Sequence, residues 1–302
     1  MRVAITGGTG LIGSRLVPVL VGLGDEVLIL TRNIAKAKEK LGKNVEVEKW
    51  DPFEGELDSG VLEGCQGIVN LAGETINSRW TKARKERILN SRIQTTFGLV
   101  KSMEKVKDKP KIFINASAVG YYGPKNDERL SENEPAGKDF LATVCKKWEE
   151  EALKAEKLGI HVVALRLGVV LASDGGALQK MLMPYRFFAG GPAGNGRQWL
   201  SWIHIEDLTK IIQYSLNNNT LEGPVNATAP QPVTNRDFSR ILGEVLHRPS
   251  WLPVPGAIMR LAFGEMADML LNGQRVVPEK LLRSGFEFQY PDLRQALENL
   301  LV

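Results

Sequence analysis

Seven residues near the start of the chain have the types and spacing of a turn that binds phosphate. The stretch Gly7-Gly8-Thr9-Gly10-Leu11-Ile12-Gly13 lies between a short β-branched run and an amphipathic one. In a strand–turn–helix unit, the first glycine permits a tight turn, the middle one lets backbone amides approach a pyrophosphate, and the last lets the helix pack close to the strand. The helix N-terminus adds free N–H groups and partial positive charge. We expect dinucleotide contacts from Gly7, Thr9, Gly10, Leu11, Ile12 and Gly13.

The residues after the second predicted strand distinguish NADP from NAD. An NAD site usually has an acidic residue there, about 20 residues beyond the glycines, to bind the ribose hydroxyls. This chain has Thr31-Arg32-Asn33 instead, with no carboxylate to repel a 2′-phosphate. Arg32 offers a guanidinium group and Thr31 a hydroxyl donor. We therefore predict NADP(H) as the cofactor; the alternative for Arg32 is a solvated surface arginine.

Other strand ends supply further candidate contacts to the cofactor. Leu71-Ala72-Gly73 closes a predicted strand with small residues, which suits a backbone beneath the adenosine half of the cofactor. Asp51 is expected either to meet the adenine amino group or to serve as a turn residue. Backbone contacts to the nicotinamide end are expected from Ala116, Leu167 and Gly168.

The elements that position these residues alternate regularly along the first half of the chain. Short apolar runs that alternate with longer amphipathic stretches predict a parallel sheet covered by helices, and hence an α/β Rossmann fold with a doubly wound sheet. The predicted strands are Arg2–Thr6, Glu26–Thr31, Val45–Glu48, Gly67–Leu71, Lys111–Ala116 and His161–Val170. The predicted helices are Ile12–Leu23, Ile34–Leu41, Lys82–Met103 and Phe140–Leu158.

The alternation ends after Leu171, where a loop-rich region with many glycines begins. A strand at Pro224–Ala227 and a helix near Asn235–Leu246 follow, and a Pro-punctuated helix lies beyond Trp251. We predict an NADP(H)-binding domain from residues 1–170 and about 205–235. A smaller, discontinuous C-terminal α/β lobe takes residues of about 171–204 and 236–302.

Composition excludes several classes of function. The 302 residues are 43% hydrophobic and 25% charged, as in ordinary globular proteins. A formal charge of +4 argues against a nucleic-acid surface. The two cysteines, Cys65 and Cys145, have no metal-ligand spacing, so we expect no metal and a reducing compartment. No apolar run reaches the roughly 20 residues of a membrane span. We expect a cytoplasmic protein without an integral membrane segment or a secretory leader; an organellar stroma or matrix is the alternative if a transit peptide is removed.

These motifs together resemble the epimerase/dehydratase branch of the extended short-chain dehydrogenase/reductase superfamily. The resemblance is carried by TGGTGLIG, by NLAG, and by Ser117 after the fifth predicted strand. NLAGETINSRW, NASAVGYYG, WIHIEDL and the final WLPVP…GQRVVP segment are similar to an atypical epimerase-like subgroup with a C-terminal domain of unknown function. Some of its members carry a cell-division-inhibitor label. The resemblance spans the chain and implies its fold and cofactor class.

The resemblance also implies a catalytic tyrosine, with a lysine one helical turn later, on the helix after the fifth strand. The corresponding residues here are Phe140 and Val144, or Leu141 and Cys145 in the other register, so the pair is degenerate. Ser117 is expected to bind the substrate oxygen; the alternative is a strand-end hydroxyl bonded to the backbone.

Candidates for the lost proton donor and for substrate contacts lie elsewhere. Tyr121 and Lys125 are four residues apart, but Gly123-Pro124 rules out a regular helix between them. Tyr121 or Tyr122 remains a candidate proton donor from a loop. His204, Arg79 and Arg92 are candidate substrate contacts, with a structural histidine and an exposed helix as the alternatives.

Two hypotheses for the function follow. The first is an NADP(H)-dependent reductase or epimerase acting on a small polar substrate, with Ser117 orienting the oxygen and Tyr122 supplying the proton. The alternative is a catalytically impaired NADP(H)-binding regulatory or interaction protein, related to cell division, which would bind a protein partner through its C-terminal region.

Overall fold

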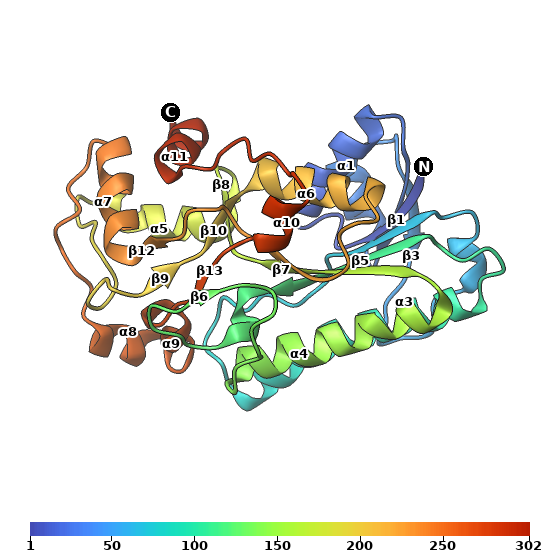
Figure 1. The fold of residues 1–302 in the computed structure, drawn as a ribbon, viewed down its shortest axis with the longest axis horizontal. Helices are drawn as coiled ribbons and strands as arrows, with labels where there is room; N and C mark the ends of the chain where they lie inside the picture. Colours follow the sequence, from blue (N-terminus) through green and yellow to red (C-terminus); the bar gives the residue numbers. More distant parts are fainter.

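The computed structural model describes residues 1–302 and is built around a seven-stranded sheet in which every strand pair is parallel (Figure 1). The chain runs outward from β1 to β3, then crosses back to β4 and proceeds in the opposite direction. Doubly wound sheets bind ligands in the crevice at such a reversal, outside the carboxyl ends of the strands. The predicted fold class is confirmed. In spatial order the strands are β11 (Gly223–Ala227), β7 (His161–Leu167), β5 (Ile112–Ala118), β4 (Gly67–Asn70), β1 (Arg2–Thr6), β2 (Glu26–Thr31) and β3 (Glu46–Lys49).

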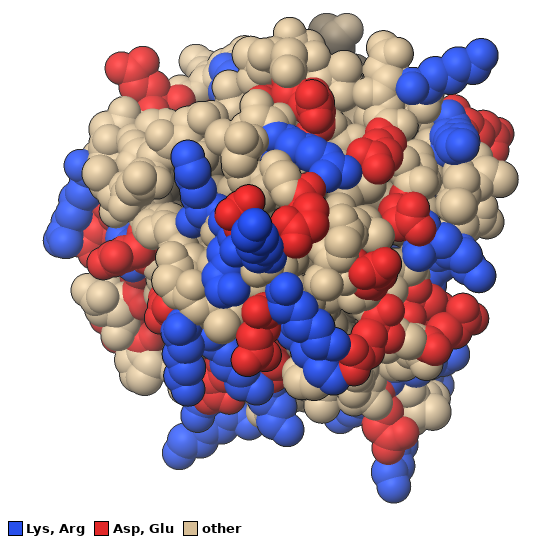
Figure 2. Space-filling view, turned by 90° about the vertical axis from the view of Figure 1, so that its right-hand side faces the viewer, with Lys and Arg blue, Asp and Glu red and all other residues tan.

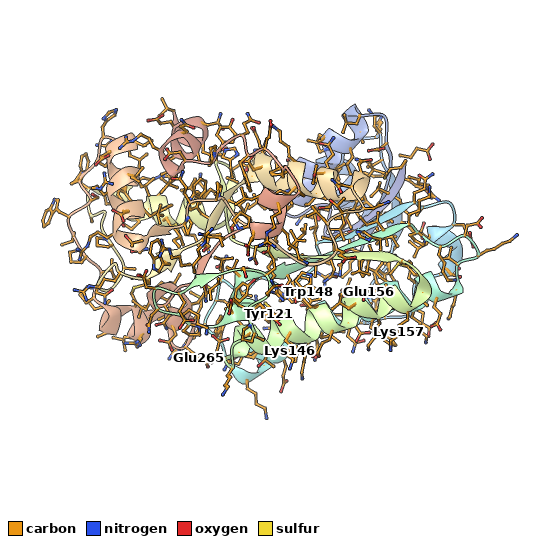
Figure 3. The ribbon with its side chains drawn as sticks, viewed as in Figure 1. Tyr121, Lys146, Trp148, Glu156, Lys157 and Glu265 are labelled. Atoms are coloured by element: carbon orange, nitrogen blue, oxygen red, sulfur yellow. The ribbon has the colours of Figure 1, made fainter.

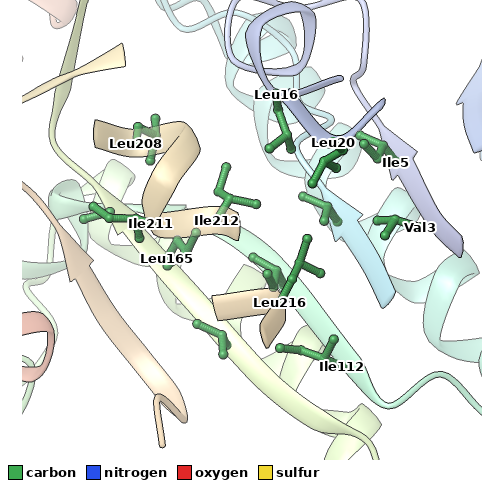
Figure 4. Close-up of a cluster of buried hydrophobic side chains, with 14 of the residues drawn as sticks. Val3, Ile5, Leu16, Leu20, Ile112, Leu165, Leu208, Ile211, Ile212 and Leu216 are labelled. Atoms are coloured by element: carbon green, nitrogen blue, oxygen red, sulfur yellow. The ribbon is translucent and has the colours of Figure 1, made fainter. Parts of the chain in front are cut away.

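Helices cover both faces of this sheet because each face presents a continuous row of apolar side chains. One buried cluster joins the sheet to α1 (Gly13–Gly22), α2 (Ile34–Leu41) and α6 (Ile205–Asn217); Figure 4 shows its centre, with Leu16 and Leu20 opposite Ile211 and Ile212. A second cluster, on the other face, includes residues of α3 (Lys82–Lys105), the end of α4 (Phe140–Ala152) and the short helix η3 (Leu153–Leu158). Burial on both sides explains why these strands read as unbroken apolar runs.

A smaller lobe packs beside the sheet domain, on the left in Figure 1. Its core joins α5 (Gly176–Arg186), α7 (Asn235–Val245) and α11 (Leu293–Leu301) through residues such as Leu182, Leu242 and Leu297. The remaining elements are η1 (Ser59–Leu62), η2 (Val119–Tyr122), β6 (Arg129–Leu130), β8 (Val169–Ala172), β9 (Trp199–Leu200), β10 (Trp202–His204), β12 (Val233–Thr234), α8 (Gly256–Phe263), α9 (Met266–Leu271), β13 (Arg275–Val276) and α10 (Glu279–Arg283).

Two parts of the chain depart from the sequence-based boundaries. The strand predicted over His161–Val170 is divided at Gly168 into β7 and β8, because the chain leaves the large sheet there to pair with β10. The segment 275–288, assigned to the lobe from sequence, instead returns to the sheet domain. Leu281 and Phe286 belong to the buried cluster that joins the sheet to α1 and α6. The chain therefore crosses between the two lobes more than once.

Charged side chains of both signs are interspersed on the face that lies at the right of Figure 1, as Figure 2 shows. No helix combines the length and the apolar character needed to cross a membrane. No three His, Cys, Asp or Glu side chains gather in a way that would hold a metal ion.

Candidate cofactor site

The glycine turn lies at the carboxyl end of β1 and leads directly into α1. Gly7 has φ +70°, and a Cβ there would lie 2.7 Å from the carbonyl carbon of Leu71. A Cβ on Gly13 would lie 2.4 Å from the carbonyl oxygen of Gly7. The Gly10 N–H donates to that same oxygen at 2.9 Å, which closes the turn. Side chains would fill this cradle, so the glycines are needed both for the turn and for a close approach by a ligand.

The adenine side of the crevice is lined by the residues after β2. Arg32 is exposed and makes no hydrogen bond or ion pair with the protein, so its guanidinium group is free to bind an anion. The Thr31 hydroxyl accepts from Asn33 N at 3.2 Å and keeps its own proton for a ligand. Asp51 accepts from Phe53 N at 3.0 Å, which is the turn role that sequence left open for it.

Lys40 is a neighbour of this site that the sequence analysis missed. Its ammonium group donates to the carbonyl of Thr9 at 2.9 Å and so links α2 to the glycine turn. The helical period was the available signal: Lys40 lies three residues after Ala37, which faces the core. A second cation therefore lies beside the phosphate-binding turn.

The end of β4 and the loop after β8 enclose the glycine turn. The Leu71-Ala72 peptide forms the wall against Gly7. Across the turn, a Cβ on Gly176 would lie 2.7 Å from the Leu11 side chain, and Arg15 of α1 pairs with Asp174 at 2.7 Å. The structure thus brings the glycine turn and the Leu71–Ala72 segment together.

At the opposite end of the crevice, β5 and β7 pair in parallel so that Ala116 and Leu167 lie on adjacent strands. Gly168 lies next in the chain, and a Cβ there would be 2.8 Å from the carbonyl oxygen of Ser201. Its N–H donates to the carbonyl of Ala227 at 3.0 Å. The N–H of Gly168 is therefore already used within the fold.

Ser117 ends β5 inside a buried polar network rather than at an open surface. Its hydroxyl donates to Glu149 of α4 at 2.6 Å. The same carboxylate accepts from Nε and Nη2 of Arg166 at 2.9 and 2.8 Å, so the two residues form a bidentate ion pair. All three side chains are almost fully buried, and a buried charge pair requires this degree of hydrogen bonding. Ser117 is thus held by Glu149 and not by the backbone.

Tyr122 belongs to the same network, and its proposed role as a displaced proton donor is wrong. The residue is fully buried, and its hydroxyl donates to Asn226 at 2.7 Å while accepting from Arg166 at 2.9 Å. Burial raises the pKa of Tyr122 to about 12, so the phenol holds its proton too tightly to exchange it near neutral pH. No substrate can reach it without breaking the network.

Tyr121, the neighbouring candidate, is half-buried. Its ring lies on the guanidinium of Arg166, 3.5 Å from Cζ to the ring centroid. Its hydroxyl makes no hydrogen bond with the protein. Figure 3 shows Tyr121 and Trp148 between α4 and the sheet.

Two residues of α4 face the end of β5. The Cys145 thiol contacts Ser117 and the backbone of Ala118, and burial raises the pKa of this thiol to about 12. A Cβ on Gly120, just after β5, would touch Leu141. Leu141 and Cys145 therefore occupy the positions that face the end of β5, and neither is an acid or base at neutral pH.

The three predicted substrate contacts lie in different places. His204 is fully buried at the start of α6, where its Nδ1 accepts from Glu206 N and its ring centroid lies 3.9 Å from that of Tyr290, which is the structural role that the sequence left open for it. Arg79 is exposed beside Gly264 of the lobe. Arg92 is half-buried and packs on Gly73, at the end of β4.

A shallow pocket of about 430 Å³, open to solvent, lies where the two lobes meet at the start of α4. Its size falls in the range of small-molecule pockets. Phe140, which lines it, precedes Leu141 and packs edge-on against Trp80 with ring centroids 5.3 Å apart. Lys85, over the Phe140 ring, pairs with Glu265 of the lobe at 2.5 Å. Aromatic rings and charges of both signs thus line this pocket.

The strand order and the glycine cradle at the switch point define a Rossmann-type dinucleotide-binding protein. Comparison with family models agrees: the NAD dependent epimerase/dehydratase family matches residues 3–227, and a domain of unknown function (DUF1731) matches residues 254–300. The chain belongs to the NAD dependent epimerase/dehydratase family and carries this C-terminal domain, as the sequence resemblance implied.

Individual relatives match along the whole length. The epimerase family protein YfhF of Bacillus subtilis (strain 168) is 43% identical, over 100% of this chain and 98% of its own. The chloroplastic SDR39U1 homolog of Arabidopsis thaliana, also named an epimerase family protein, is 40% identical over 100% of this chain and 87% of its own. A crystal structure of human SDR39U1 with NADPH is 35% identical, covers 99% of both chains and has a TM-score of 0.88.

Proposed function

We propose that this protein binds NADP(H) in the crevice above the glycine turn. The observation that carries the proposal is the free guanidinium of Arg32 at the end of β2, where no carboxylate opposes a 2′-phosphate. The cradle of Gly7, Gly10 and Gly13 fits a pyrophosphate, and Lys40 adds a cation nearby. The NADPH in the related human structure supports the same cofactor.

The cofactor would supply hydride chemistry, and we propose a reductase or epimerase reaction on a small polar substrate. The pocket beside Phe140 has room for such a molecule and lies next to the helix that faces the end of β5. Because Tyr122 is buried and its hydroxyl is hydrogen-bonded within the fold, Tyr121 is the remaining tyrosine candidate for the proton transfer. Ser117 would have to give up its bond to Glu149 before binding a substrate oxygen.

A specific observation supports a second candidate function, in which the bound cofactor is structural or reports redox state and the protein regulates or binds a partner. Leu141 and Cys145 replace the acid and the cation of the catalytic pair, and Ser117 is already bonded inside the fold. The cofactor cradle needs none of these groups. A protein that binds its cofactor without turning it over would keep the glycine cradle and lack the catalytic groups, as in this arrangement.

Calorimetry with NADPH and NADH tests the cofactor assignment. Arg32→Asp should weaken NADPH binding at least tenfold, because it removes a charge-assisted contact to the 2′-phosphate and adds a like charge, of order 1.4 kcal/mol or more. NADH, which lacks that phosphate, serves as the internal control and should bind the variant no more weakly than the wild type. Unchanged NADPH affinity in the variant refutes the assignment.

Turnover separates the two candidate functions. The wild type and Tyr121→Phe are incubated with NADPH and a panel of carbonyl compounds, and NADPH absorbance is followed. Both proteins are also incubated with NADP⁺ and nucleotide sugars, and the sugars are analysed for epimerised product, because an epimerase returns the hydride and gives no net change in the cofactor. Turnover of either kind by the wild type that falls in Tyr121→Phe supports the enzyme and its proton donor. NADPH binding without oxidation or epimerisation, together with cofactor-dependent capture of a partner, supports the binding protein.

A further inference from the structure

Arg92 lies on the buried face of α3, between Ile88 one turn before it and Thr96 one turn after it, both fully buried. A charged side chain on such a face needs a specific reason to be there. Its Nη1 donates to the carbonyls of Ile88 and Glu74 at 3.0 and 3.1 Å, which fixes the guanidinium plane. The side chain is therefore held in place rather than extended into solvent.

The guanidinium lies against the backbone of Gly73. A Cβ at this glycine would be 3.1 Å from Arg92 Cζ, 3.2 Å from Nη2 and 3.4 Å from Nε. Gly73 directly follows the Leu71-Ala72 peptide that forms the wall of the glycine turn. Because Gly73 has no side chain, the guanidinium of Arg92 can lie against its backbone. A cation therefore lies at the edge of the cofactor crevice, at the end of β4.

The other side of the guanidinium faces α4. Arg92 Cζ lies 5.0 Å from the ring centroid of Trp148, whose indole N–H is fixed by Thr96 at 2.9 Å. Trp148 lies on α4 three residues after Cys145, the residue in the position of the missing lysine, and in Figure 3 it lies between α4 and the sheet. The positive charge of Arg92 lowers the pKa of the Cys145 thiol in opposition to burial.

Two of the three guanidinium nitrogens, Nε and Nη2, make no hydrogen bond with the protein. A fixed cation with free donors suits oxygen acceptors such as the hydroxyls of a ribose. From this placement we propose that Arg92, a fixed cation near the position of the missing lysine, binds the nicotinamide ribose of NADP(H). The inference rests on the proposed function, since it assumes that this cofactor occupies the crevice.

Calorimetry with two ligands tests the assignment, because each reports on a different half of the site. NADP⁺ spans the whole crevice, whereas 2′,5′-ADP has the adenine half and its 2′-phosphate but no nicotinamide ribose. Arg92→Met should weaken NADP⁺ binding by about tenfold, the usual effect of losing a hydrogen bond to a charged group. It should leave 2′,5′-ADP within twofold of the wild type.

The matched control is Arg87→Met, an exposed arginine on the same helix, which should change neither affinity. Arg32→Asp should weaken both ligands. Unchanged NADP⁺ binding in Arg92→Met, or an equal loss for both ligands, overturns the assignment of Arg92. Failure of the wild type to bind either ligand overturns the cofactor proposal, and this inference with it.

A crystal structure of the wild type with NADP⁺ covers the case in which Arg92→Met does not fold, since Arg92 also holds the Glu74 carbonyl. The assignment predicts a guanidinium nitrogen within about 3.5 Å of a nicotinamide-ribose hydroxyl. An Arg92 that contacts only the protein overturns it. Arg92→Lys, which keeps the charge, should retain most of the NADP⁺ affinity.

Discussion

At the scale of single residues, the polar side chains at the ends of β5 and β7 are buried and bonded to one another. Glu149 and Arg166 cancel each other's charge, and their network takes up the hydroxyls of Ser117 and Tyr122. Removing one partner of such a pair leaves a buried charge, which typically costs 3–5 kcal/mol. The network therefore stabilises the ends of β5 and β7 and at the same time withholds these groups from a substrate.

Cys145 gives a direct test of this chemistry. Because burial raises its pKa to about 12, only about 10⁻⁴ of the thiol is ionised at pH 8, and the thiolate is the reactive form. Neither Cys145 nor the buried Cys65 should react with Ellman's reagent in the native protein, whereas both should react after denaturation. Ser173→Cys, at an exposed position, is the positive control. Rapid modification of Cys145 in the native protein would contradict its description as a buried, protonated thiol.

At the scale of elements, α1 shows how one position can serve both folding and binding. The helix begins at Gly13 because only a glycine lets its first turn lie so close to Gly7. The N-terminus of α1 consequently points its free N–H groups at the crevice. The close packing that completes the core is the same feature that builds the phosphate site.

Two alanine substitutions in α1 separate these contributions. Gly13→Ala should destabilise the protein by about 1–3 kcal/mol through overpacking and should abolish binding of NADPH, because the new methyl group displaces the turn. Gly22→Ala lies at the other end of the helix with nothing within 4 Å of the added atom. It should leave binding unchanged and raise stability by about 0.5–1 kcal/mol. Urea denaturation and calorimetry measure both effects; wild-type affinity in Gly13→Ala would contradict the cradle.

At the scale of the whole molecule, the two lobes are joined where the chain crosses between them. Asp207 of α6 accepts from the backbone N–H groups of Gln289 and Tyr290 at 2.8 and 2.9 Å, just before α11. His204 packs on the Tyr290 ring beside this contact. These contacts thus hold the end of the segment 275–288 on the sheet domain, just before the chain enters the lobe again at α11.

The burial of His204 makes this junction sensitive to acid. Desolvation lowers the pKa of His204 below its usual value near 6.5, so the unfolded chain binds a proton more readily than the folded one. Its contribution to stability is present above pH 6.5 and is lost as the pH falls toward the folded pKa.

We expect the wild type to lose more stability between pH 7.5 and pH 5.5 than His204→Asn, in which asparagine can still cap α6. Urea denaturation at both pH values measures the difference, and groups that titrate in both proteins cancel. His247→Asn, at an exposed residue, should keep the wild-type pH dependence. Equal losses of stability in the wild type and in His204→Asn would show that His204 does not contribute to the pH dependence.

The sequence by itself determined the sheet, the glycine turn and the cofactor class, because these depend on local patterns. Apolar runs, the spacing of Gly7 and Gly13, and the absence of an acid beside Arg32 can each be read within a few neighbouring residues. The absence of a tyrosine from the predicted helix Phe140–Leu158 could also be read in this way.

Only the tertiary structure decided which polar side chains remain available. Ser117 and Arg166 are far apart in sequence, and both bond Glu149 because β5, β7 and α4 pack together, while Tyr122 joins this network through Arg166. His204 is buried by Tyr290, a residue 86 positions further along the chain. Burial and hydrogen bonding are set by contacts between distant segments, so they decide whether a candidate residue faces a ligand or the core.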